Sequence, residues 1–447
     1  MILHLLLACA GDGDGSGALA STLDLALSDV IPTVVTASWQ ATDGATSAAV
    51  DFGMDGQRTW TAPATLEDGR WTATLVGLKP GVTATVVAVE QVDGETLESD
   101  EATIETGTSS DMPTLTLGAQ EAGAWSEGFL VGTIVTSPAA AVIIDPDGEI
   151  VWWFEDTEND QVGRARLSAD GRGVWVMGIN AHNQGYNSLL WISLDGTETN
   201  RIDVGDGHHD FVEHEDGSLA WLTHQAQMVD GANLLGDTLT VRAPDGSTST
   251  LWSIFDWRDY DPDEGLQNEN GGGGNPAAGG AVMWTHCNSL NYQDGAYLVG
   301  SLGLSALMKI DATTGELLWT FGSRTSDFTD AQGDTSLLEL QHQFQLLDDS
   351  LLVFENGSTD RGASRAVEFS FDQQTPVVEE IWTYAPDPDL YTFSLGNVQR
   401  LEDGSTLVNF ATSGQVDHVS PEGQVLWRLS SYLGTAFGYL EHVPTLY

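Results

Sequence analysis

The sequence has few basic residues, almost no cysteine and no long apolar segment. Only 15 Lys and Arg stand against 66 Asp and Glu in 447 residues, which gives a formal net charge of −51. Nucleic acid and anionic membrane surfaces are both bound by neutralising basic patches, so this charge balance disfavours them as partners. An anionic small-molecule ligand would need a local positive site within the negative field of the protein.

Cysteine occurs only at Cys9 and Cys287. The chain opens with MILHLLLAC, in which residues 6–9 resemble the lipobox where bacterial exporters cleave a signal peptide and acylate the cysteine. This apolar stretch is too short to span a bilayer. We expect residues 1–20 to be signal peptide and flexible spacer, with Cys9 carrying lipid on a periplasmic or cell-surface protein, anchored in the outer membrane. An ordinary apolar terminus is the alternative. With Cys9 lipidated, no disulfide within the chain is available.

A helical pattern of period 3.6 is also lacking, whereas the sequence contains 50 Gly and many short Thr-, Val- and Trp-rich segments. These features predict an all-β chain with tight turns. Residues 21–108 alternate in short segments between Asp-Gly turns, with Trp39, Trp60 and Trp71 as core anchors, which is typical of a β-sandwich. Residues 75–81 resemble a corner of fibronectin type III domains, so an Ig/fibronectin-III-like sandwich is expected, as a spacer or a homodimerisation surface.

Residues 112–447 repeat one unit, in which an Asp-Gly or similar turn precedes apolar strands and a second turn leads into a strand that usually holds tryptophan. The second half of the unit begins six times, at Asp145, Leu194, Ala243, Asp311, Thr375 and Ser420. The first half is marked by turns at Asp170, Asp216, Asp294, Asp348 and Asp403. Six copies with this spacing predict a six-bladed β-propeller.

The innermost strand of each propeller blade lines a central channel, so matched positions form rings around its axis. Counting seven residues back from the second residue of each first-half turn reaches five polar side chains: Arg164, Asp210, Asn288, His342 and Asn397. Counting nine back reaches His208 and His286 on the same strand face. A single bulge would exchange His208 for His209, so both are candidates. The other histidines, His214 and His224 among them, are expected to be ordinary core or surface residues.

These histidine segments resemble the arylsulfate sulfotransferase family. The resemblance lies in Gly207-His-His-Asp-Phe211, in Thr285-His-Cys-Asn-Ser289 and in Gln341-His-Gln343, followed by Phe354-Glu-Asn-Gly357 and Ser364-Arg365. It implies transfer of a sulfuryl group from a phenolic sulfate ester to a phenol without a nucleotide or other cofactor. By the same resemblance His342 is the nucleophile, and His286 with His208 or His209 donates protons and binds sulfuryl oxygens. Asn288 and Asn356 are expected to bind substrate.

One position departs from the family pattern, because Leu302 stands where an arginine is expected. Losing a cation that binds sulfuryl oxygens lowers rates by about 100- to 1,000-fold in comparable sites. Arg365, Arg361 or Arg324 would have to substitute, although a surface ion pair is the better assignment for Arg324.

An insertion at residues 256–280 is expected to act as a lid over the channel. Its Asp259-x-Asp261-x-Asp263 pattern lacks the glycine of a calcium loop, and no metal site is predicted.

Two other functions remain open. A quinone-cofactor dehydrogenase would share the blade motif at residues 311–319, but only one unit carries that motif in full. A non-catalytic cell-surface binding module would keep the scaffold and lose turnover, which the leucine at position 302 would explain.

Overall fold

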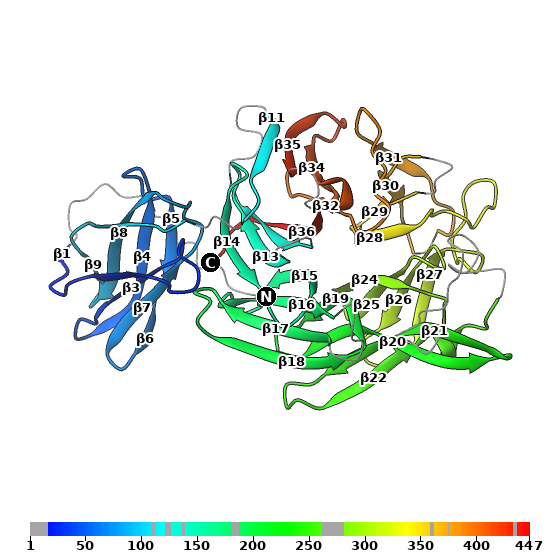
Figure 1. Ribbon diagram of the computed structural model, residues 1–447, viewed down its shortest axis with the longest axis horizontal. Coiled ribbons are helices and arrows are strands. Elements are labelled where there is room, and N and C mark those ends of the chain that lie inside the picture. Colours follow the sequence, from blue (N-terminus) through cyan, green and yellow to red (C-terminus); the bar gives the residue numbers. More distant parts are fainter. Residues whose placement is uncertain are drawn as a thin grey trace. The chain divides into compact units, whose positions relative to one another are not determined.

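The computed structural model describes residues 17–108, 112–120, 127–135, 139–180, 187–261, 281–357, 362–373, 375–431 and 436–447. In these ranges the regular secondary structure is almost entirely β-strand, with one short helix, α1 (Ile254–Trp257), and one 3₁₀ turn, η3 (Ala411–Ser413). No helix in the described ranges is long and apolar enough to cross a membrane. The predicted all-β class is therefore confirmed. The chain forms two compact units, Met1–Ser109 with Tyr447, and Ser110–Leu446 (Figure 1).

The amino-terminal unit consists, over its described residues, of two antiparallel-rich sheets. One sheet contains β1 (Gly17–Ala18), β4 (Ala45–Met54), β5 (Trp60–Pro63), β8 (Thr83–Val92), β9 (Glu95–Glu98) and β10 (Ala102–Glu105). The other contains β2 (Asp24–Leu27), β3 (Val35–Gln40), β6 (Thr65–Glu67) and β7 (Arg70–Leu75).

Both sheets contribute side chains to a single hydrophobic core. Along β7 every second residue, including Trp71, turns inward, as the two-residue period of a strand requires. Trp39 is fully buried and donates its indole N–H to Glu90 at 2.8 Å. Trp60 is half-buried against the same core. The three tryptophans predicted as core anchors therefore do pack there.

The larger unit consists of six sheets over its described residues. They are β12 (Phe129–Ile134), β13 (Ala140–Ile144) and β14 (Ile150–Glu155) with β36 (Phe437–Val443); β15 (Gln161–Leu167), β16 (Gly173–Ile179), β17 (Asn187–Ser193) and β18 (Thr199–Gly205); β19 (Gly207–Glu213), β20 (Leu219–Val229), β21 (Ala232–Arg242) and β22 (Thr248–Ser253) with β23 (Val282–Met283); β24 (Cys287–Gln293), β25 (Ala296–Ser301), β26 (Ala306–Asp311) and β27 (Leu317–Gly322); β28 (Gln341–Leu346), β29 (Ser350–Glu355), β30 (Arg365–Ser370) and β31 (Glu380–Tyr384); and β32 (Asn397–Arg400), β33 (Thr406–Phe410), β34 (Gln415–Val419) and β35 (Val425–Ser431) with β11 (Leu115–Gln120).

Each predicted repeat corresponds to one of these sheets. The strands that follow the six second-half turns are β14, β18, β22, β27, β31 and β35. The first five each lie at one edge of their own sheet, and β35 is next to the edge strand β11. The turn at Asp294-Gly295 has positive φ at both residues, 51° and 75°, which suits the twist of a two-residue hairpin. Hydrophobic clusters form between neighbouring sheets, for example between β19–β22 and β24–β27.

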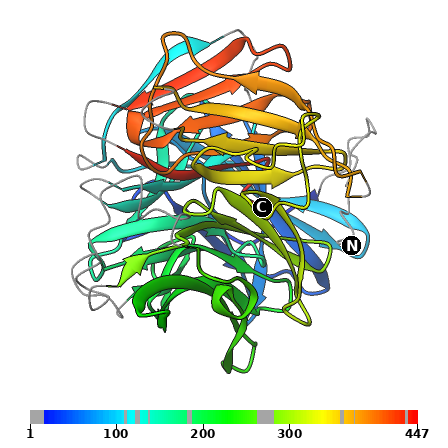
Figure 2. The ribbon, with the colours of Figure 1, turned by 90° about the vertical axis from the view of Figure 1, so that its right-hand side faces the viewer.

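One edge strand of each sheet, called its first strand here whatever its place in the chain, contacts the first strands of the two neighbouring sheets, which gives a closed cycle. β36 contacts β15, and contacts then run from β15 to β19, β24, β28, β32 and back to β36. Two strands from the ends of the unit complete sheets in which they are not consecutive: β36 pairs with β12, and β11 pairs with β35. In Figure 1 the colours accordingly pass from cyan through green and yellow to red around the unit, and Figure 2 shows the same succession from the side. The sequence repeats did not predict these two pairings.

The faces that the first strands turn inward are polar, as the register predicted. The five polar residues reached by counting seven back are all at most 3% exposed. Arg164 bonds Glu441 at 2.7 Å, and Asp210 accepts the backbone N–H of Leu290 at 2.9 Å. These pairings link neighbouring sheets and satisfy buried charges.

Candidate functional site

Three histidines from three neighbouring sheets meet at one place. His209 lies on β19, His286 directly precedes β24, and His342 lies on β28. The ring centroid of His209 is 4.9 Å from that of His286 and 6.4 Å from that of His342. Imidazoles at these separations can contact a single tetrahedral anion together.

The backbone directs the first two of these rings by an unusual local conformation. His209 and His286 have φ of 57° and 45°, in the left-handed region that non-glycine residues seldom adopt. Leu340 and Leu395 have the same conformation at the matching positions of their strands. The pairing register shifts between His208 and Phe211, so in the sheet that begins with β19 a bulge places His209 at the position expected for His208. Strained backbone at recurrent positions is a feature of functional sites.

Asn356 orients His342. The amide nitrogen of Asn356 donates to the backbone oxygens of Thr392 and Leu395 at 2.7 and 2.9 Å, which leaves its Oδ1 as the atom facing Nδ1 of His342 at 3.0 Å. Since Oδ1 can only accept, Nδ1 carries the proton. Nε2 of His342 therefore presents a lone pair, and it is buried without a hydrogen-bond partner.

Burial keeps the three rings uncharged at neutral pH. Burial, and then the nearby His286, lower the pKa of His342 to about 3. Burial lowers the pKa of His286 to about 4 despite the opposing charge of Asp237. Burial and the neighbouring imidazoles also hold the pKa of His209 well below its usual range. An uncharged imidazole is the nucleophilic form of histidine.

His208 turns away from this group and joins His224 and Asp237. Its Nδ1 lies 2.7 Å from Nδ1 of His209, and its ring stacks on His224 with centroids 3.7 Å apart. His224, expected to be an ordinary core or surface residue, thus lies in direct contact with a histidine that was predicted for the site. Asp237 was not identified from the sequence, although the Asp230-Gly231 turn provided a signal. Counting outward from that hairpin turn pairs His224 directly with Asp237 across β20 and β21.

Asn288 is a fully buried link between sheets. Its side-chain amide donates to the backbone oxygen of Gln341 at 3.0 Å, and its backbone oxygen accepts the hydroxyl of Tyr439. The first contact holds β24 against β28, and the second joins β24 to β36. Its proposed part in binding substrate stays a prediction.

The candidate cations lie in different surroundings. Arg365 donates to Glu355 at 2.7 Å and to Glu380 at 2.9 Å within its own sheet, so its guanidinium is already paired with two carboxylates. Arg324 forms an exposed ion pair with Asp261 at 3.1 Å, as expected. Leu302 is half-buried and donates its backbone N–H to the oxygen of His286 at 3.0 Å. Arg361 lies outside the described residues, as do Cys9 and most of the predicted lid.

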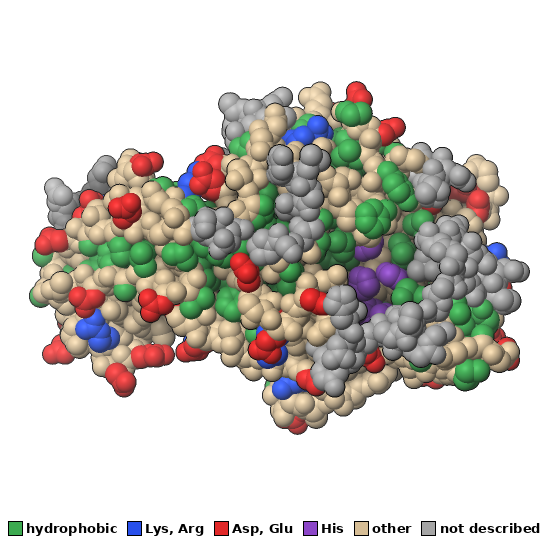
Figure 3. Space-filling view, in the orientation of Figure 1, with side chains coloured by type: hydrophobic (Ala, Val, Ile, Leu, Met, Phe, Trp, Pro, Cys, Tyr) green, Lys and Arg blue, Asp and Glu red, His purple; other side chains and the backbone are tan. Residues whose placement is uncertain are grey.

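A cavity of about 480 Å³ opens beside the histidines. Its lining includes His208, His209 and His224, together with Tyr439 and the exposed ring of Phe393. Histidine side chains are visible from outside on the face shown in Figure 3. Of the described side chains that line this cavity, none is Lys or Arg. The cavity offers imidazoles and aromatic surface to a small ligand.

Comparison with known proteins gives one informative match. No curated protein matches the sequence. A solved structure from a study of two prolyl endopeptidases is 10% identical with a TM-score of 0.28, and the alignment covers 89% of this chain and 55% of that chain. This chain thus spans about half the length of that structure, and so distant a similarity supports no conclusion about fold or function.

The model of one protein family, described as Arylsulfotransferase (ASST), matches residues 118–428. The matched region is more than half of the chain and contains all the histidines of the site. On this evidence the chain belongs to the arylsulfotransferase (ASST) family.

Proposed function

We propose that this protein moves a sulfuryl group from a phenolic sulfate ester to a phenol through a sulfo-histidine formed on His342. Membership of the family supports aryl sulfotransferase activity on small aryl sulfates and phenols. The observation that carries the assignment of the nucleophile is the buried Nε2 of His342, which has no hydrogen-bond partner and whose lone pair is fixed by the contact of Nδ1 with Asn356.

The reaction divides into two transfers at sulfur. In the first, the Nε2 lone pair attacks sulfur, the N–S bond forms, and the S–O bond to the aryl group breaks with its electron pair leaving on the phenolate. In the second, the oxygen of the acceptor phenol attacks sulfur, the N–S bond breaks, and Nε2 regains its lone pair. Dividing one difficult transfer into two in this way lowers each barrier.

The surrounding residues serve charge and proton movement in this scheme. Oδ1 of Asn356 accepts a hydrogen bond from the Nδ1–H of His342, whose ring becomes positively polarised when sulfur binds Nε2. An N–H of His286 or His209 donates to sulfuryl oxygens and protonates the departing phenolate, and the acceptor phenol later returns the proton. Arg365 takes no part in this scheme, because two carboxylates already bind its guanidinium.

We further propose that the six sheets of the larger unit are the blades of a six-bladed β-propeller. The closed cycle of first strands and the pairing of the terminal strands β11 and β36 support this architecture. The two sheets of the amino-terminal unit, with their shared core, support an Ig/fibronectin-III-like sandwich.

Export and lipid attachment at Cys9 also remain our proposal. Mass spectrometry of the mature protein from its own cell envelope, with Cys9→Ala as the comparison, would test it. A diacylglycerol mass that disappears in the variant is expected, and an unmodified or uncleaved amino terminus would contradict the proposal.

The activity is tested with 4-nitrophenyl sulfate, with and without added phenol. We expect release of nitrophenolate that depends on the acceptor, and an SO₃ adduct of about 80 Da on the peptide containing His342, as a covalent intermediate on Nε2 requires. Both should be lost in His342→Ala. The control is His214→Ala, because His214 contacts Tyr297 outside the site. Equal rates for the His342→Ala and wild-type proteins would refute the proposal. Saturable binding of the ester without release of phenolate would instead favour the non-catalytic binding module.

A further inference from the structure

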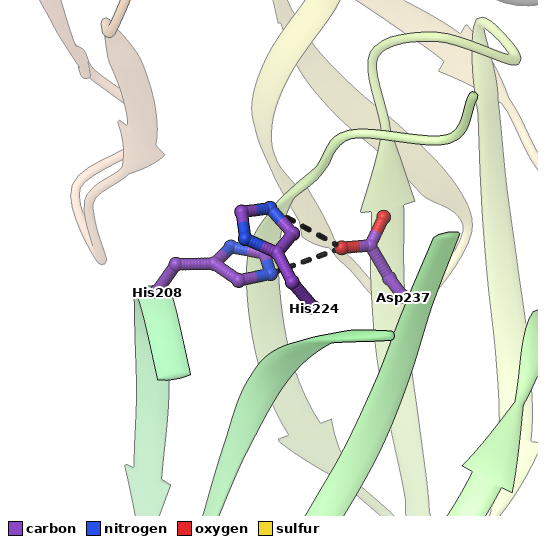
Figure 4. Close-up of side chains that lie close together, drawn as sticks. All are labelled: His208, His224 and Asp237. Carbon is purple, nitrogen blue, oxygen red and sulfur yellow. Dashed lines mark ion pairs between the residues drawn. The ribbon is translucent and has the colours of Figure 1, made fainter. Parts of the chain in front are cut away.

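Three strands of one sheet direct metal-ligating atoms to a common point. Nε2 of His208 on β19 lies 2.9 Å from Oδ1 of Asp237 on β21, and Nε2 of His224 on β20 lies 3.8 Å from the same oxygen. The three atoms all lie within 4.8 Å of one another. Figure 4 shows both imidazoles directed at the carboxylate.

None of these three atoms has a hydrogen-bond partner in the described structure, although all are buried. Oδ1 of Asp237 is in ion-pair contact with Nε2 of His208 at 2.9 Å, but Nε2 of His224, at 3.8 Å, is beyond hydrogen-bonding distance of that oxygen. Buried polar atoms without partners are costly and uncommon in native proteins. Three of them at one point require a common explanation.

Two hydrogen bonds to Oδ2 fix the orientation of the Asp237 carboxylate. Its Oδ2 accepts the hydroxyl of Thr285 at 2.5 Å and the backbone N–H of Cys287 at 2.7 Å, so Oδ1 is directed at the two imidazoles. Hydrogen bonds that fix a carboxylate in this way are typical of the surroundings of a metal centre. A simple Asp–His pair would leave Nε2 of His224 unexplained.

We propose that His208, His224 and Asp237 bind one divalent transition-metal ion of the zinc class. With metal–ligand bonds of about 2.0–2.2 Å, separations of 2.9 and 3.8 Å correspond to ligand–metal–ligand angles of roughly 90° and 130°. These angles lie on either side of the tetrahedral value, and the second does not fit neighbouring positions of an octahedron. Two imidazoles also disfavour Ca²⁺ and Mg²⁺, which select oxygen ligands. Three protein ligands leave a fourth position open, beside the cavity that His208 and His224 line.

Metal binding would change the state of His209, a consequence that rests on the proposed sulfuryl transfer. A metal on Nε2 of His208 leaves the proton on Nδ1, which then donates to Nδ1 of His209 at 2.7 Å. His209 must therefore carry its own proton on Nε2, as a donor for a sulfuryl or phenolic oxygen. Without a metal, a proton on Nε2 of His208 would reverse this assignment. The ion would also bring positive charge to a cavity whose described lining lacks Lys and Arg.

The site is tested by metal binding without substrate. Untagged full-length protein, stripped with a chelator, is titrated with Zn²⁺ and with Co²⁺ as a spectroscopic probe. We expect one ion per chain, a visible Co²⁺ absorption of tetrahedral type, and an affinity at least 100-fold lower in His224→Gln. The matched control is His214→Gln, which changes the histidine directly after β19 and should bind as the wild type does. His224 is 18% exposed, so its variant is the one expected to fold if Asp237→Asn does not.

Failure of the metal site can be told apart from failure of the proposed activity. Absence of a stoichiometric ion, or equal affinity in wild-type and His224→Gln proteins, would overturn the site even if 4-nitrophenyl sulfate is turned over. Stoichiometric binding by a protein that releases no nitrophenolate would keep the site and refute the activity.

Discussion

The contact between Asn356 and His342 allows the nucleophile assignment to be tested without removing the nucleophile. Asn356→Leu keeps a similar volume but removes the acceptor that holds the proton on Nδ1 of His342. Both partners are buried, so an unsatisfied Nδ1–H would cost about 1–3 kcal/mol, and the proton would move to Nε2. Because each 1.4 kcal/mol is a factor of ten, we expect kcat/KM for 4-nitrophenyl sulfate to fall by about 5- to 150-fold.

The control is Ser364→Ala. Ser364 donates to the backbone oxygen of Asn356 and accepts the N–H of Thr392, so it supports the same loop without touching His342. Rates would be measured as the burst of nitrophenolate in single turnovers, with urea unfolding to correct for lost stability. If Asn356→Leu stays within twofold of the wild type, or if Ser364→Ala loses as much activity, then the tautomer of His342 is not what Asn356 controls.

Three further predictions concern acid, charge and sheet closure. The kcat/KM should stay level from pH 7 to about pH 5, since the pKa of His342 is about 3 and that of His286 is about 4. An acid limb near pH 6.5 would contradict this. The unfolded chain binds this proton first, so the free energy of unfolding should fall as pH drops from about 6.5 towards 3, with a shallower slope in His342→Gln. Arg365→Gln should lower the free energy of unfolding in urea by about 3 kcal/mol, because it removes the cation that pairs with the buried carboxylate of Glu355. A 100-fold loss of kcat with stability intact would restore Arg365 as catalytic. Gly132→Ala should lower the free energy of unfolding by about 1–3 kcal/mol, because its Cβ would collide with the backbone of β36 at Tyr439. Gly118→Ala should be neutral in thermal melts, because its Cβ meets only Arg428 at 3.7 Å.

Much of the fold and part of the site were predictable from short-range patterns. The Asp-Gly turns, the alternation within strands and the recurring tryptophan strands anticipated each sheet, since these signals reside in contiguous residues. Counting from the turns also placed His286 and His342 on a common side. The same count reached His208 and not His209, because the spacing of residues in the sequence does not reveal a bulge that exchanges two neighbours. Both histidines were therefore candidates. His224 was passed over because only its partner across the next hairpin, Asp237, distinguishes it from a core histidine.

The sequence by itself determined the all-β class, the repeated unit, the negative charge and the polar lining of the first strands, because each depends on residue type and period along the chain. Only the tertiary structure decided that β36 and β11 complete sheets begun at the other end of the unit. It alone brought His209, His286 and His342 within reach of one another, and turned the carboxamide of Asn356 so that Nε2 of His342 is left with a lone pair. These features depend on atoms from separate sheets converging in space, and such convergence is established only when all the sheets have packed together.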